Sequence, residues 1–261
     1  MLPYRIGIAH AQAGAPVETL ITFDPTTGEL PEGVTVDNCG NVYVGIVSTG
    51  ELRKLSTTGE QLTLATLDTG RGPEAGYGLV GLAVDPAGNV YAALASFVEA
   101  THGVWRVRPD GASERLAVLP VTTVPNALAF DRRGNLFVSD SLGGKIYRVA
   151  RGARLAEVWS SDPRLVGDLS LGLEAVGANG VAFYSGALFV ANSDAARIYR
   201  IPVAPDGSAG RPVLHFDGIQ VPRHRLRRAG EPVCRHRPRQ YSDQGRCRRH
   251  RAGLGLGGGW P

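Results

Sequence analysis

The stretch GLAVDPAGNVYA, residues 81–92, decides the fold, because it recurs along the chain as an apolar run, an Asp-x-x-Gly-Asn turn and a second apolar run. Further copies read GVTVDNCGNVYV at 33–44 and ALAFDRRGNLFV at 127–138, and a fourth, GVAFYSGALFV at 180–190, has a shortened turn. Asp and Asn bond their own backbone in turns and Gly supplies a positive φ, so each copy predicts a β-hairpin.

Each hairpin is followed by a run of alternating apolar and charged residues, a polar turn and another short apolar run. The alternating runs lie at 51–55, 104–107, 145–149 and 197–201, and the later runs include 113–119 and 213–216. Four antiparallel strands in a period of about 40 to 50 residues are typical of a β-propeller blade. We expect an all-β propeller of four-stranded blades, incomplete at about four blades plus part of a fifth, with residues 17–30 supplying an outer closing strand.

The composition divides the chain into three parts. We expect an N-terminal extension at 1–16, propeller blades at 17–220 and an Arg- and Gly-rich tail at 221–261. The tail carries eleven Arg, one Glu and one Asp, so the net charge of +4 comes from the tail and the rest is acidic. Because the tail lacks Lys, aromatic interleaving and apolar periodicity, we interpret it as disordered or out-of-frame sequence rather than a nucleic-acid-binding arm.

The sequence predicts a small-molecule substrate as the only class of binding partner. No run of 18 apolar residues exists, so we expect no membrane partner, and we also expect no nucleic acid. We predict a monomer that takes a small-molecule substrate. The compartment stays open between the cytoplasm and export with the signal lost, because Ala9-His10-Ala11 resembles a cleavage site without an apolar region before it.

One position of the repeat carries the predicted chemistry: the residue five before the turn Asp, at the start of the innermost strand. In the four repeats, in chain order, this residue is Glu32, Val80, Asn126 and Asn179. Asp217 takes the same position where a fifth blade is expected. Because repeats place equivalent positions around one axis, we expect these side chains to meet at the mouth of the central channel. One Glu, one Asp and two Asn suit one divalent cation, Ca²⁺ first, with Mg²⁺, Mn²⁺ and Zn²⁺ as alternatives. The competing interpretation is that each polar residue caps its own strand.

A second set of residues returns to the same end of each hairpin, five residues past the turn Asn. They are Ile46, Leu94, Asp140 and Asn192. We therefore expect a small-molecule pocket whose polar half includes Asp140 and Asn192 and whose apolar half comes from the first two blades.

Four short segments resemble the metal-ligand motifs of the SMP-30/gluconolactonase/regucalcin family. They read Pro31-Glu32-Gly33-Val34, Pro125-Asn126-Ala127-Leu128, Ala178-Asn179-Gly180-Val181 and Phe216-Asp217-Gly218-Ile219. The resemblance covers roughly residues 30–220. It implies a six-bladed propeller, lactone hydrolase activity and one axial divalent cation held by Glu32, Asn126, Asn179 and Asp217. The repeats are also similar to NHL-type and strictosidine-synthase-like propellers.

Two departures narrow the implied substrate. Sugar-lactonase members carry Arg and Asp where this chain has Val124 and Ala127, so a more apolar lactone or ester is easier to accommodate. Our hypothesis is a divalent-metal-dependent hydrolase of a lactone or related ester, with Asp217 or Asp140 accepting the proton of the attacking water. The alternative is a non-catalytic NHL-like propeller that binds a ligand or protein and holds a structural cation.

Overall fold

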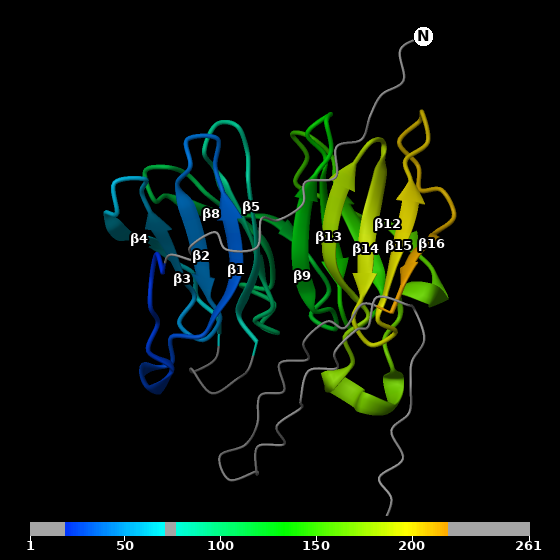
Figure 1. Ribbon diagram of the computed structural model, residues 1–261, viewed down its shortest axis with the longest axis horizontal. Helices are drawn as coiled ribbons and strands as arrows, with labels where there is room; N and C mark the ends of the chain where they lie inside the picture. The colour runs from blue at the N-terminus through cyan, green and yellow to red at the C-terminus, as the bar shows by residue number, and fades with distance from the viewer. Residues whose placement is uncertain (1–18, 71–76, 219–261) are drawn as a thin grey trace, which may run out of the picture. The chain divides into compact units, whose positions relative to one another are not determined.

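The computed structural model describes residues 19–70 and 77–218, which form the four antiparallel sheets of Figure 1. Each sheet has four strands in sequence order, and we call the sheets blades one to four. The strands are β1 (Pro31–Val36), β2 (Val42–Ile46), β3 (Glu51–Leu55) and β4 (Gln61–Thr66) in blade one, then β5 (Leu79–Val84), β6 (Val90–Leu94), β7 (Gly103–Val107) and β8 (Ser113–Val118) in blade two. Blade three holds β9 (Pro125–Phe130), β10 (Leu136–Asp140), β11 (Lys145–Val149) and β12 (Ala156–Ser161), and blade four holds β13 (Ala178–Tyr184), β14 (Ala187–Asn192), β15 (Arg197–Pro202) and β16 (Val213–Asp217). The expected all-β architecture of four-stranded blades is confirmed.

The Asp-x-x-Gly-Asn turn builds each of the first three hairpins through one carboxylate. In blade two, Asp85 Oδ1 accepts the backbone N–H groups of Ala87 and Asn89 at 2.9 Å, and its Oδ2 accepts Asn89 Nδ2 at 2.8 Å and the Tyr91 hydroxyl at 3.1 Å. Gly88 has φ +82°, a conformation that side chains disfavour. The same bonds recur around Asp37 and Asp131, without the tyrosine in the second case.

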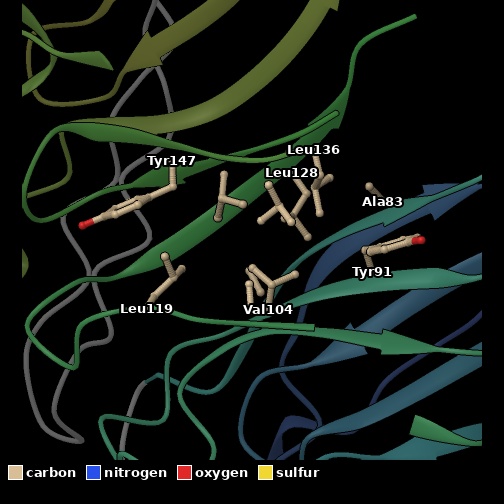
Figure 2. Packing of buried hydrophobic residues seen from close by; sticks show 11 residues of the cluster. Ala83, Tyr91, Val104, Leu119, Leu128, Leu136 and Tyr147 are labelled. Carbon is tan, nitrogen blue, oxygen red and sulfur yellow. The ribbon is translucent and has the colours of Figure 1, made fainter. Parts of the chain in front are cut away.

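Neighbouring blades pack face to face, with their innermost strands side by side. β1 contacts β5, β5 contacts β9 and β9 contacts β13. A separate apolar cluster fills each of the three junctions between successive blades. Figure 2 shows the junction of blades two and three, where Leu128 and Leu136 lie between Tyr91 at one end of the cluster and Tyr147 at the other.

The face of blade one that lies away from blade two has no partner among the described residues. Val34 of β1 is 62% exposed, although the equivalent Leu82 and Leu128 of β5 and β9 are each 7% exposed because a preceding blade covers them. The described chain is therefore an incomplete propeller.

Residues 19–30 do not form the expected outer strand. They contain the 3-10 turn η1 (Pro25–Thr27), capped by Asp24, and Gly28 follows it at φ +84°. This turn keeps the segment from pairing as a strand, and it is held instead by the bond from Val47 N to Leu30 O. Two further 3-10 segments, η2 (Pro163–Leu165) and η3 (Leu169–Glu174), connect blade three to blade four.

Several expectations about the ends of the chain lie outside the described residues, namely those for 1–16 and 221–261. In the described part, no helix is long and apolar enough to span a bilayer.

Candidate functional site

A β-bulge stands at the head of every innermost strand. Two residues of the inner strand face one residue of the second strand, in the pairs Glu32-Gly33 with Gly45, Val80-Gly81 with Ala93, Asn126-Ala127 with Ser139, and Asn179-Gly180 with Ala191. The first residue of each bulge is the position that the sequence singled out. Because the same register shift occurs in every blade, the predicted structural equivalence of these four positions is confirmed. Bulges re-aim side chains and recur beside functional sites.

The bulges of neighbouring blades lie next to one another, because successive inner strands approach closely. A Cβ on Gly33 would lie 2.5 Å from Val80 O, and a Cβ on Gly81 would clash with Asn126 O. At the next junction the Ser139 hydroxyl donates to Asn179 O at 2.6 Å. The structure thus places the inner strands that carry Glu32, Val80, Asn126 and Asn179 side by side in that order.

The oxygens at these positions differ in how they are engaged. Glu32 is exposed, whereas Asn126 and Asn179 are half-buried. Asn179 Nδ2 donates to Ser193 Oγ at 2.9 Å, which turns its carbonyl oxygen away from the hydroxyl. The Asn126 side chain makes no hydrogen bond to another described residue. Sequence reasoning missed Ser193, although a hydroxyl directly after the second strand of blade four is visible in the sequence.

The predicted position of Asp217 at the head of an inner strand is wrong. Asp217 is the last residue of β16, the outermost strand of blade four, and its register partner there is Arg197. The Arg197 Nε donates to Asp217 Oδ1 at 3.1 Å. Three strand spacings separate Asp217 from β13, roughly 14 Å in a regular sheet, so the structure does not bring it to the bulges.

Asp140 and Asn192 lie opposite the first residues of β9 and β13, as expected, but they are only 2% and 1% exposed. Asp140 Oδ1 accepts the N–H groups of Val124 at 2.9 Å and Leu142 at 3.2 Å. The Asn192 side chain also has its hydrogen bonds satisfied: its Nδ2 donates to the carbonyls of Arg164 and Val166, and its Oδ1 accepts the N–H of Ala195. Both side chains are buried and support the loops that enter the inner strands, and their predicted place on a pocket wall stays a prediction.

The apolar side of the site comes from loops rather than from Ile46 and Leu94, which are fully buried in the sheets. Val80, Ala95 and Val124 form a small cluster, against which Tyr77, Phe97 and Leu142 pack. The rings of Tyr77 and Phe97 meet edge to face at 5.4 Å, and burial, together with the nearby Glu174, raises the pKa of Tyr77. This apolar wall adjoins the Val80 bulge.

His102 holds the loop that carries Phe97. The ring is fully buried; its Nδ1 accepts the Phe97 N–H at 3.1 Å, and its Nε2 lies 3.1 Å from Thr123 Oγ1. Thr123 in turn donates to Pro120 O at 2.7 Å. Burial lowers the pKa of His102, so the folded protein favours the neutral ring.

Acidification is expected to destabilise the fold through His102. The unfolded chain binds a proton at this residue near pH 6.5, whereas the folded chain resists it, so stability is complete above about pH 6.5 and falls as the pH drops below it. A His102→Asn variant keeps an acceptor for Phe97 N–H and should flatten this dependence between about pH 5 and 7. Urea unfolding at several pH values measures it, with the exposed His215→Asn as control; an equal slope in both variants would contradict the assignment.

Metal ligands of the commonest kinds do not cluster here. Within residues 19–70 and 77–218, no three His, Cys, Asp or Glu side chains come together in a group that could hold a metal ion. A cation at the bulges would therefore depend on amide oxygens and one carboxylate.

Comparison with known proteins extends the description of the fold. No protein-family model matches the sequence, and no curated protein gives a significant match. A catalytically inactive variant of virginiamycin B lyase from Staphylococcus aureus, solved with quinupristin, is 17% identical over 76% of this chain and 59% of its own, with a TM-score of 0.56. A nidogen/laminin complex is 17% identical over 70% and 62%, and a candidate gluconolactonase is 19% identical over 72% and 65%, each with a TM-score of 0.50.

The chain spans less than two thirds of the length of each of these three structures. At such low sequence identities, the similarity to these structures concerns the fold alone. It agrees with the four antiparallel, four-stranded blades described above. The described chain is an incomplete β-propeller.

Proposed function

We propose that this chain is a divalent-metal-dependent hydrolase of a lactone or related ester, with the cation held at the inner-strand bulges by Glu32, Asn126 and Asn179. The observation that supports it most is the repeated bulge, which gives three of four equivalent positions an oxygen-bearing side chain. Carboxylate and amide oxygens are the ligands that hard cations prefer.

The oxygen atoms of these three side chains are ligands that suit a hard divalent cation, although together they carry only one negative charge. Glu32 supplies one negative charge, and the two amides supply neutral oxygens. Asn179 is oriented by Ser193, because its Nδ2 is already committed to that hydroxyl. Hard cations accept several water ligands, so three protein oxygens suffice for binding of low affinity.

The chain's own residues also suit a partly apolar substrate. Val80 takes the place of an oxygen ligand at the bulge of blade two, and Tyr77, Phe97 and Val124 extend this apolar side. Contact with these side chains would orient the apolar part of a lactone beside the oxygen ligands. A bound divalent cation would supply Lewis-acid polarisation of the carbonyl and a water of lowered pKa. A virginiamycin lyase and a candidate gluconolactonase share the fold, which is compatible with such chemistry.

The alternative is a non-catalytic propeller that binds a ligand or protein and uses the cation structurally. It is favoured by the bonding of Asp140 and Asp217, since each is engaged away from the bulges and neither is available there to accept a proton. A nidogen/laminin complex also shares the fold.

The Glu32→Gln variant tests the proposed cation site. Loss of the only carboxylate at the bulges should weaken Ca²⁺ binding by about 10- to 100-fold, because a charged ligand is replaced by a neutral one. Calorimetric titration of Ca²⁺ measures this, and Glu60→Gln, an exposed turn residue of the same blade, should leave the affinity unchanged.

A panel of aliphatic and aromatic lactones, assayed with and without chelator, separates the two functions. The proposal expects hydrolysis that chelator and Glu32→Gln both abolish. Hydrolysis indifferent to chelator would overturn the metal mechanism. Calcium binding without turnover of any ester would favour the non-catalytic propeller.

A further inference from the structure

A cavity of about 280 Å³ lies at the junction of blades two and three, and none of the bulge residues lines it. Its walls come from β6 to β9, the start of β10, the end of β11 and the turn that joins β11 to β12. Tyr91, which Figure 2 places at one end of the cluster between these blades, forms part of the wall. The volume is slightly below the range usual for drug-sized ligands, so it suits a single-ring molecule.

The cavity lies where the glycine of one turn does not approach the preceding blade. The turn between the third and fourth strands closes the other two junctions: a Cβ on Gly111 of blade two would lie 2.6 Å from Leu64 O of blade one. In blade four, Gly207 O accepts Arg148 Nη1 at 2.6 Å and Trp159 Nε1 at 2.8 Å. At the equivalent Gly152 of blade three, a Cβ would meet nothing within 4 Å.

The lining of this cavity is cationic. Among the described residues, it contains Arg106, Arg151 and Arg154 and no carboxylate. Arg106 and Arg154 share the nearby Glu114, one on each carboxylate oxygen. Arg151 is exposed and makes no ion pair with a described residue. Two positive charges therefore remain uncompensated around the cavity.

One buried polar atom of a lining residue, Arg106 Nε, lacks the partner that its counterpart in the next blade has. Arg148 occupies the position of Arg106 one blade later, and its Nε and Nη2 both donate to Glu157 Oε1, at 2.8 and 2.5 Å. Arg106 gives only its Nη2 to Glu114, and its Nε is buried with no hydrogen-bond partner in the described structure. A buried donor without a partner is destabilising, and a shift of the Arg106 side chain toward an anionic oxygen in the cavity would satisfy it.

The remaining walls are apolar and aromatic. The rings of Tyr91 and Phe130 meet edge to face at 4.9 Å, and Leu116 and Leu136 complete this side. Such a surface favours a flat, apolar body next to the guanidinium groups. We propose that this cavity binds a small aromatic monocarboxylate, with the carboxylate at Arg106 and Arg151 and the ring against Tyr91 and Phe130.

Calorimetric titration of the full 261-residue chain with benzoate tests the proposal. Chelator in the buffer removes any contribution from a cation at the bulges. We expect a dissociation constant on the order of 1 mM, typical of a ligand this small. Benzamide, which keeps the ring and loses the charge, should bind at least about 10-fold more weakly.

Arg151→Gln should weaken benzoate binding by about 10-fold without loss of folding, because Arg151 makes no ion pair with any residue that the structure describes. Arg132→Gln removes the same charge from an exposed turn of the same blade and should leave the affinity unchanged. Arg106→Gln is the second variant, with thermal unfolding measured alongside to separate lost binding from lost structure.

Three results would overturn the proposal: benzoate binding that both arginine variants leave intact, benzamide binding as tight as that of benzoate, or inorganic phosphate competing with equal affinity. The last would mark a plain anion site with no contribution from the aromatic wall. None of these outcomes bears on the Ca²⁺ affinity of Glu32→Gln, so the two proposals fail separately.

Discussion

A Gly81→Ala variant is expected to lose about 3 kcal/mol or more of unfolding free energy, because the added methyl group has no room in the bulge of β5. Its Cβ would clash with the backbone oxygen of Asn126, and backbone atoms of two packed inner strands cannot move apart independently. Displacing the Asn126 peptide should also weaken Ca²⁺ binding in whatever fraction folds. Urea unfolding followed by the fluorescence of Trp105 and Trp159 measures the stability.

Gly180→Ala is the matched control for this prediction. Gly180 is the equivalent bulge residue of blade four, but it is exposed, and its Cβ would meet no atom within 4 Å. Its stability should therefore stay within about 1 kcal/mol of that of the unchanged protein. Equal losses at the two glycines would show that the close approach of β5 and β9 is not what requires Gly81.

Asp140→Ala is expected to lose about 2 to 4 kcal/mol of stability, because it leaves the buried Val124 N–H and the Leu142 N–H without their acceptor. Both groups bond the same oxygen, Oδ1. Asp140→Asn keeps an oxygen at that place, so we expect it to lose no more than about 1 kcal/mol. Urea unfolding of the two variants side by side makes the measurement.

The asparagine variant also separates a structural role from a catalytic one. An amide preserves the loop but cannot accept a proton as a carboxylate does. If Asp140 only supports the loop, Asp140→Asn should retain its Ca²⁺ affinity and any lactone hydrolysis. Hydrolysis abolished in a stably folded Asp140→Asn variant would instead restore Asp140 as the proton acceptor that the sequence suggested.

The hairpins were predictable because their information is local. Asp85, Gly88 and Asn89 make the turn through bonds that span at most four residues, so a three-residue signature suffices to identify it. The alternating third strands and the blade period follow from the same short-range patterning. The fold class and the equivalence of Glu32, Val80, Asn126 and Asn179 could therefore be derived from the sequence.

Asp217 shows where that reasoning fails. Its Asp-Gly-Ile context imitates the Asn-Gly-Val that begins β13, but strand position depends on the pairing partner, and Arg197 pairs Asp217 into the outermost strand. A short sequence motif does not determine which strand its residues pair with, and hence not their place in the sheet. The same limit applies to residues 17–30, where Pro25 and the left-handed Gly28 form a turn in place of a strand.

The repeat, the four-stranded blade and the set of side chains at the heads of the inner strands could all be derived from the sequence, since each depends on contiguous residues. Only the tertiary structure decided how those side chains are used. The bulge that presents Asn126 and the bond from Val124 N–H to Asp140 depend on how the strands of one blade pair, and the gap at Gly152 depends on how one blade meets the next. These contacts join residues on different strands, and close packing fixes their positions to fractions of an ångström, a precision that a local sequence pattern does not provide.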